Sequence, residues 1–246
     1  MKLAMRTALG LALAGTVALG ACGGGNANQP APTLATASAQ AAAAPVTPES
    51  LERDPLALFP SGALGMFSVD LRAFYTSPSA GPAAAALAEK YFPVGAEAGF
   101  SASRDLDRVM GGFYSMQGAD ALATLVGRFD EAKIQKLADQ KTQLRGGGLV
   151  VASTYAGRTM FTVADAGFTV LTPHLVLAGT KTTMKRALDR IRDRRLTHDA
   201  PAWMLQTLAT PAAAATLALD TKSMPLASLT GGMPLKGTDG MTALRL

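Results

Sequence analysis

Residues 146–180 have the sequence GGGLVVASTYAGRTMFTVADAGFTVLTPHLVLAGT, and this stretch decides the fold. Short apolar runs alternate in it with glycine, Ala-Gly, aspartate and proline, a pattern typical of strands joined by tight turns. We expect strands at Leu149–Tyr155, Thr159–Val163, Phe168–Leu171 and Leu175–Ala178. The turns are predicted at Ala156-Gly157, at Asp165-Ala166-Gly167 and at Pro173. The stretch therefore predicts an antiparallel β-meander.

The segments on either side of the meander add further strands and helices. Strands are expected at Ala63–Leu71, Arg108–Met116, Ala121–Phe129, Ala213–Asp220 and Thr238–Leu246, with a hairpin turn at Gln117-Gly118-Ala119-Asp120. Helices are expected at Ser79–Tyr91, from Asp130 to about Lys141, at Lys181–Arg195 and at Pro201–Leu208. In the third helix Met184, Leu188 and Ile191 recur at helical spacing. The pattern predicts an α+β fold with a largely antiparallel sheet and three or four helices packed on it.

The length of the folded region fits one domain. Residues 51–246 number 196, and 48% of the whole chain is hydrophobic, so a sizeable core is expected. Before it, Gly23–Pro48 holds no charged and no aromatic residue. Such a segment buries too little apolar surface to offset the cost of ordering its backbone, so residues 22–50 are predicted to form a disordered tether.

The amino terminus carries the most specific pattern in the chain. Lys2 and Arg6 precede an uncharged, mostly apolar stretch from Thr7 to Ala18, which is too short to span about 30 Å of hydrocarbon. Leu19-Gly20-Ala21-Cys22 follows and contains the only cysteine of the chain. This arrangement favours a cleaved signal peptide over a membrane span. It also leaves no second cysteine for a disulfide.

Residues 1–22 resemble the lipobox signal of bacterial lipoproteins, in which a leucine and two small residues precede a cysteine. The resemblance implies that residues 1–21 are removed and that Cys22 carries the lipid, including palmitate-type acyl chains. It implies a protein anchored to a membrane of the cell envelope. Gly23, where aspartate favours the inner membrane in enterobacterial lipoproteins, favours the outer membrane, facing the periplasm. The alternative is an ordinary secretory signal with a chance cysteine.

The sequence shows no recognisable catalytic or metal site. His174 and His198 stand far from any set of ligands at metal-binding spacing, and Gly146-Gly147-Gly148 precedes a strand instead of a helix. The carboxylate pairs Asp105/Asp107 and Asp189/Asp193 are interleaved with arginines, which is typical of solvated pairs. We therefore predict a protein that is not an enzyme and has no cofactor and no metal.

The helix expected at Lys181–Arg195 is strongly basic, with seven lysines and arginines against two aspartates. One interpretation is a patch for an anionic partner, an envelope protein or anionic lipid, formed by Lys185, Arg186, Arg190 and Arg194. The other is a solvated face stabilised by pairs such as Lys185–Asp189. Nucleic acid is not expected, because no aromatic side chains are interleaved with the charges.

Three functional hypotheses follow from the sequence. The first is a non-enzymatic envelope lipoprotein whose tethered domain binds another envelope component. The second is a carrier of a lipid or small ligand, which requires an apolar cavity between the sheet and its helices. The third is an enzyme with an unfamiliar site, which requires a pocket with converging polar groups.

Overall fold

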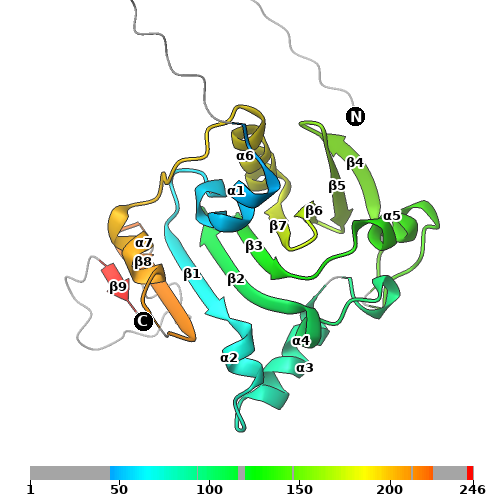
Figure 1. Ribbon diagram of the computed structural model, residues 1–246, viewed down its shortest axis with the longest axis horizontal. Helices are drawn as coiled ribbons and strands as arrows, with labels where there is room; N and C mark the ends of the chain where they lie inside the picture. Colours follow the sequence, from blue (N-terminus) through cyan, green and yellow to red (C-terminus); the bar gives the residue numbers. More distant parts are fainter. Residues whose placement is uncertain are drawn as a thin grey trace, which may run out of the picture. The chain divides into compact units, whose positions relative to one another are not determined.

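The computed structural model describes residues 45–92, 94–115, 120–145, 147–211, 213–223 and 243–245. Its strands form one antiparallel sheet in the order β4-β5-β6-β7-β3-β2-β1-β8-β9 (Figure 1). The predicted α+β fold with a largely antiparallel sheet is therefore confirmed. The predicted signal peptide, Cys22, most of the tether and residues 116–119 of the predicted hairpin turn lie outside the described residues.

The predicted meander forms one end of the sheet. The strands are β1 Gly65–Asp70, β2 Leu106–Phe113, β3 Ala121–Gly127, β4 Val151–Tyr155, β5 Arg158–Val163, β6 Ala166–Thr172, β7 Leu175–Thr180, β8 Ala215–Asp220 and β9 Ala243–Arg245. Strands β4 to β7 pair in chain order, as the sequence predicts. Pairing between β7 and β3, with Leu122 opposite Gly179, then joins the meander to the rest of the sheet.

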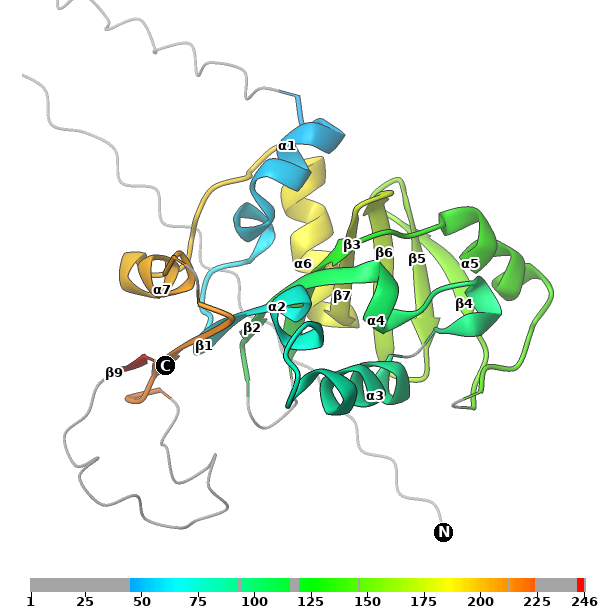
Figure 2. The ribbon, with the colours of Figure 1, turned by 60° about the horizontal axis from the view of Figure 1, so that its bottom comes forward.

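Helices cover both faces of the sheet. They are α1 Pro48–Arg53, α2 Leu71–Tyr75, α3 Gly81–Tyr91, α4 Ala102–Asp105, α5 Glu131–Asp139, α6 Lys181–Arg192 and α7 Ala202–Leu208, with 3-10 turns η1 Pro55–Leu58 and η2 Ala96–Ala98. Asp130 caps α5 as predicted, since its carboxylate accepts a hydrogen bond from the Lys133 amide at 3.1 Å. Figure 2 shows α1, α6 and α7 on one side of the sheet and α3 on the other.

Alternating side chains of the strands divide the core into two clusters. On β7, Leu175 and Leu177 belong to the cluster under α1 and α6, whereas Val176 belongs to the cluster beneath α5 and the segment that joins α3 to α4. This alternation is the period of two that a strand imposes. Because the meander is buried on both faces over part of its length, its strands contain continuous apolar runs.

One predicted turn of the meander is wrong. The sequence places it at Asp165-Ala166-Gly167, but Val163 already pairs with Ala166, and Ala164 takes the positive φ of 53° that the turn requires. Gly167 lies within β6, where a side-chain carbon would come 3.2 Å from the Met184 sulfur of α6. This glycine therefore makes room for helix packing and does not mark a chain reversal.

The folded region begins before residue 51. Thr47 and Ser50 form a capping box at the start of α1, with Thr47 Oγ1 accepting from the Ser50 amide at 3.2 Å. Val46 packs against the first core cluster. Part of the segment expected to be tether is thus fastened to the domain.

Candidate ligand pocket

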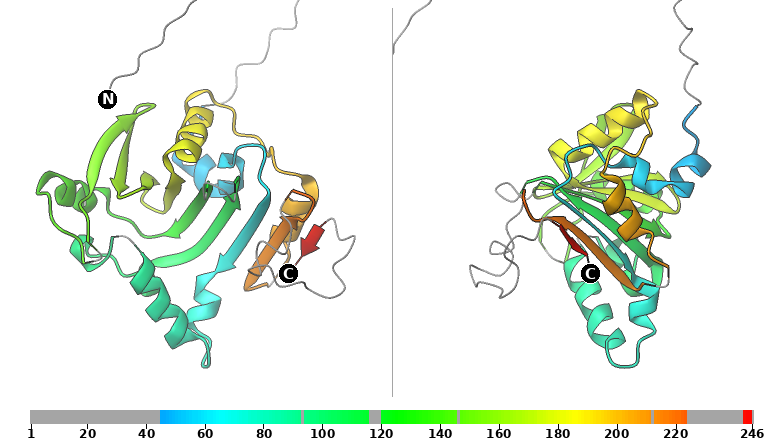
Figure 3. Two further views of the ribbon diagram at one scale, coloured as in Figure 1. Left: turned by 180° about the vertical axis from the view of Figure 1, so that it is seen from behind. Right: turned by 90° about the vertical axis from the view of Figure 1, so that its left-hand side faces the viewer.

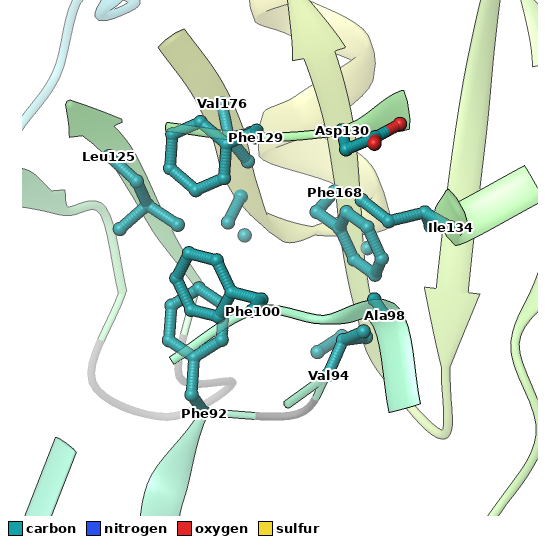
Figure 4. Close-up of a pocket in the computed structure, with 14 residues that line it drawn as sticks. Phe92, Val94, Ala98, Phe100, Leu125, Phe129, Asp130, Ile134, Phe168 and Val176 are labelled. Atoms are coloured by element: carbon teal, nitrogen blue, oxygen red, sulfur yellow. The ribbon is translucent and has the colours of Figure 1, made fainter. Parts of the chain in front are cut away.

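An apolar pocket of about 250 Å³ lies on the face of the sheet that carries the second core cluster. Its floor is formed by β3, β6 and β7, and its walls by α5 and the segment between α3 and α4. The lining residues are Phe92, Val94, Ala98, Phe100, Leu125, Phe129, Asp130, Ile134, Ala166, Gly167, Phe168, Val176, Ala178 and Gly179 (Figure 4). All but Asp130 are apolar, so the pocket offers almost no hydrogen-bonding groups.

Three phenylalanines form a column along one side of the pocket. The Phe92 and Phe100 ring centroids are 4.7 Å apart, and those of Phe100 and Phe129 are 5.6 Å apart, both pairs stacked. Figure 4 shows this column facing Phe168 and Ile134 across the open space. Phe92 and Phe100 come from the connection between α3 and α4, whereas Phe129 is the second residue after β3. The column thus fixes the wall segment to the sheet.

The single charge in the lining belongs to Asp130, at the margin of the pocket. Its carboxylate accepts a hydrogen bond from the Lys133 amide and lies 3.3 Å from the Lys133 ammonium. The Lys133 amide, followed by the Lys133 side chain, lowers the pKa of Asp130 below its ordinary value. A negative charge therefore stays at the margin of the pocket at neutral pH.

Carboxylates also hold the wall segment in place. Glu89 of α3 accepts hydrogen bonds from the Ser101 hydroxyl at 2.6 Å and from the Ser103 amide at 3.0 Å. Burial opposes the ionisation of Glu89, but these serine hydrogen bonds outweigh it and lower the pKa. Glu97 of η2 accepts the Arg145 amide at 2.7 Å. The Glu89 contacts thus join α3 to the start of α4, and the Glu97 contact joins η2 to the loop after α5.

Asp105 fastens the end of the wall segment at α4. Its side chain is 10% exposed, accepts the Ser101 amide at 3.0 Å and forms ion pairs with Arg104 and Arg128. The Arg104 guanidinium is the main cause that lowers the pKa of Asp105 to about 2, against an opposing effect of burial. The expectation of a solvated Asp105/Asp107 pair is therefore wrong for Asp105, which is buried, while Asp107 pairs with Arg72 at 2.5 Å.

The structure places the four residues of the predicted anionic-partner patch in different environments. Arg190 is 9% exposed, pairs with Asp199, and donates to the carbonyl oxygens of Ala57 at 3.2 Å and Thr197 at 2.6 Å. Its guanidinium lies inside the domain and does not belong to a surface patch. The signal that could have shown this is its spacing, since Arg190 stands three residues after Ala187 and seven after Thr183, both buried on the same face of α6.

The other three residues of that patch are exposed. Arg186 lies over the Tyr114 ring and donates to the Ser61 carbonyl at 2.8 Å, while Lys185 lies over the Tyr155 ring at 5.1 Å. Arg194 follows α6 with a positive φ of 57°. Asp189 pairs with Arg192 at 2.8 Å, whereas the interpretation as a solvated face offers Lys185 as its partner. Binding of an anionic partner by this face stays a prediction.

Both histidines of the chain lie apart from the pocket. His174 Nδ1 lies 3.1 Å from the Gly127 carbonyl, and His198 Nε2 lies 2.8 Å from the Asp54 carboxylate. Within the described ranges, no three histidine, cysteine or carboxylate side chains gather as metal ligands would. In the same part of the chain, no helix is both long and apolar enough to cross a bilayer.

The carrier hypothesis requires an apolar cavity, but the sequence patterns do not locate this pocket. The signal was present in the stretch from Phe92 to Phe100, FPVGAEAGF, in which two aromatics flank residues that break a helix. Aromatic side chains on a connection must pack on something beyond their own element. What they pack on is set by the pairing of β7 with β3, which the sequence does not reveal.

Comparisons with known proteins give the fold alone. No protein-family model matches the chain, and no curated protein matches it. Crystal form I of TP0453 is similar in structure, with a TM-score of 0.52 at 12% identity over 78% of this chain and 71% of that one. Crystal forms IV and III of TP0453 give TM-scores of 0.49 and 0.47 at 12% and 13% identity, each over 78% of this chain and 73% and 72% of theirs. At this sequence identity the similarity shows a shared fold and gives no function for this chain.

Proposed function

We propose that this protein is a lipid-anchored lipoprotein of the cell envelope whose tethered domain binds a small, uncharged apolar ligand. The apolar pocket between the sheet and the segment joining α3 to α4 carries the proposal. Of the three hypotheses from the sequence, the carrier is the one that requires such a space. The protein faces the periplasm from the outer membrane in this proposal.

The size of the pocket limits the ligand. An engineered apolar cavity of about 150 Å³ stays dry and binds benzene, whereas drug-sized ligands occupy about 300–1,000 Å³. The volume here, about 250 Å³, lies between these values. It suits one or two aromatic rings or part of a single acyl chain.

The negative charge of Asp130 at the margin limits which ligands the pocket can bind. An anionic group placed in the pocket beside Asp130 would lose its water and meet a carboxylate that stays ionised. The Lys133 ammonium already pairs with that carboxylate and offers little compensation. The pocket therefore favours uncharged molecules over free carboxylates of the same apolar size.

Ligand binding is tested with 6-propionyl-2-dimethylaminonaphthalene (Prodan), an uncharged fluorophore with two fused aromatic rings. Fluorescence titration of the purified full chain is expected to show saturable binding with one site per chain. Ala178→Phe places a ring in the pocket from β7 and should weaken binding at least tenfold, because the added ring occupies the ligand's space.

The matched control places the same ring on the surface. Ala83 is exposed on α3 and does not line the pocket, so Ala83→Phe should leave the titration unchanged. Thermal unfolding of both variants shows whether the fold survives. Equal probe binding by wild type and by a folded Ala178→Phe variant would remove the pocket as the binding site.

The anchor is tested separately from the pocket. Cells fed radioactive palmitate are expected to label the wild-type chain and not the Cys22→Ser variant, because Cys22 is the only thiol in the chain. Detection of both chains by immunoblot controls for expression. Persistent label on Cys22→Ser would contradict the lipoprotein assignment and leave the pocket proposal untouched.

A further inference from the structure

Strand β4 forms one margin of the sheet, and its outer edge is not paired with any described strand. Val151 to Thr154 are exposed on both faces of the strand, and Val151 is 56% exposed, a high value for a large aliphatic side chain. Figure 3 shows the β4–β5 hairpin projecting from the sheet, and α5 contacts β4. An exposed edge strand presents unpaired amide and carbonyl groups to other chains.

This edge lacks the features that keep edge strands from associating. Monomeric proteins protect such edges with lysine, proline, inward-pointing charges or bulges. Residues 147–157 contain no charged residue and no proline, and the β4–β5 ladder runs from Val151 to Tyr155 without a register shift. The edge is therefore open to pairing with another strand.

The register of the hairpin shows which groups point outward. The two-residue turn at Ala156 and Gly157, with φ of 50° and 75°, makes Tyr155 and Arg158 a hydrogen-bonded pair. In an antiparallel ladder such pairs alternate, so Ser153 and Val151 also direct their backbone groups toward β5. The amide and carbonyl groups of Ala152 and Thr154 consequently point away from the sheet.

We propose that two copies of this chain associate through β4, paired antiparallel about a two-fold axis at Ser153. In this register Ala152 of each copy exchanges both backbone hydrogen bonds with the partner's Thr154. Val151 then lies opposite the partner's Tyr155, a β-branched and aromatic pair that is favourable across strands. The arrangement covers Val151 and joins two sheets into one.

A second copy is favoured as the occupant because a two-fold axis sets each strand against itself. Any charge near the axis would then face its own copy, which is destabilising. The uncharged strand avoids this cost, and the flanking charges, Arg145 and Arg158, lie beyond the five residues of β4. An edge selected for a charged peptide would instead carry complementary charges.

Cysteine crosslinking of the full chain tests the register directly. In a Cys22→Ser background, Ser153→Cys supplies the only thiol, and the two copies would meet across the axis at a Cα separation of about 4.5 Å, within disulfide reach. Oxidation should yield a disulfide-linked dimer. Thr154→Cys, one residue along, is the matched control, because its symmetry mate lies too far away and should not crosslink.

Sedimentation of the uncrosslinked full chain tests the association. The wild type should sediment at twice the mass of a single chain, and Thr154→Pro, which removes an outward amide, should sediment as a monomer with an unchanged circular dichroism spectrum. Thr154→Val keeps the amide and should stay dimeric. A monomeric wild type, a dimer that survives Thr154→Pro, or equal crosslinking at 153 and 154 would overturn the proposal.

Discussion

Arg190 shows how one residue of a basic helix can have a role opposite to that of its neighbours. On α6, Lys185 and Arg186 lie over ring faces and Arg192 pairs with surface aspartates. The Arg190 guanidinium instead reaches inward and joins η1 to the loop after α6. Removing such a buried cation leaves carbonyl oxygens and a carboxylate without their donor. Its contribution is therefore to stability.

Arg190→Ala is expected to lower the free energy of unfolding by about 2–4 kcal/mol, since the Ala57 and Thr197 carbonyl oxygens lose their donor. Urea denaturation at neutral pH measures this loss. The exposed Arg194 provides the comparison, and Arg194→Ala should change the unfolding free energy by no more than about 0.5 kcal/mol. Equal effects of the two substitutions would contradict an internal role for Arg190.

At the scale of elements, carboxylates hold the wall segment between α3 and α4 in place more than helix formation does. The helical turn within it, η2, and the helix that follows it, α4, have only three and four residues, too few to be stable alone. Hydrogen bonds to Glu89, Glu97 and Asp105 replace the missing helical stability. The shape of the pocket should consequently depend on the ionisation of these groups.

The ionisation of Asp105 determines how the stability of the fold changes with pH. Because its folded-state pKa is lowered to about 2, it contributes stability that is fully present above its unfolded value near 4 and is lost as the pH falls toward about 2. Asp105→Asn should cost roughly 2 kcal/mol at neutral pH, and the difference from wild type should shrink below about pH 4. Urea denaturation across this pH range checks it, and a constant difference would show that ionisation is not the cause.

The elements differ in how far the sequence could predict them. Strands of the meander follow from apolar runs and from Ala156-Gly157, because the pairing partners are neighbours along the chain. The turn after β5 occupies residues 164–165 but is predicted at 165–167, because Gly167 resembles a turn glycine although it serves packing against Met184. Helix α2 was missed, since five residues after β1 give too short a pattern to show a period.

The candidate site was predictable only in part. The proposed anchor rests on a continuous motif, so Cys22 can be proposed from the sequence alone. The pocket combines Phe92 and Phe100 with Val176 and Ala178, which lie about 80 residues further along the chain. No local pattern brings these residues together, because pairing between β3 and β7 creates the floor on which the wall rests.

At the scale of the whole molecule, the three proposals concern separate parts of the chain. The anchor precedes the described residues, the pocket lies on the floor formed by β3, β6 and β7, and the proposed dimer uses the outer edge of β4. Their tests therefore have separate readouts: palmitate label, probe fluorescence and sedimenting mass. Failure of one leaves the other two standing.

The sheet order also has a consequence for the timing of folding. Strand β1 lies between β2 and β8, and its pairing with β8 joins Gly65 to Leu219. During synthesis the chain therefore has to be made past residue 219 before this pairing is complete, whereas the meander closes through neighbouring strands. A chain with such distant partners stays incompletely folded until β8 has been made.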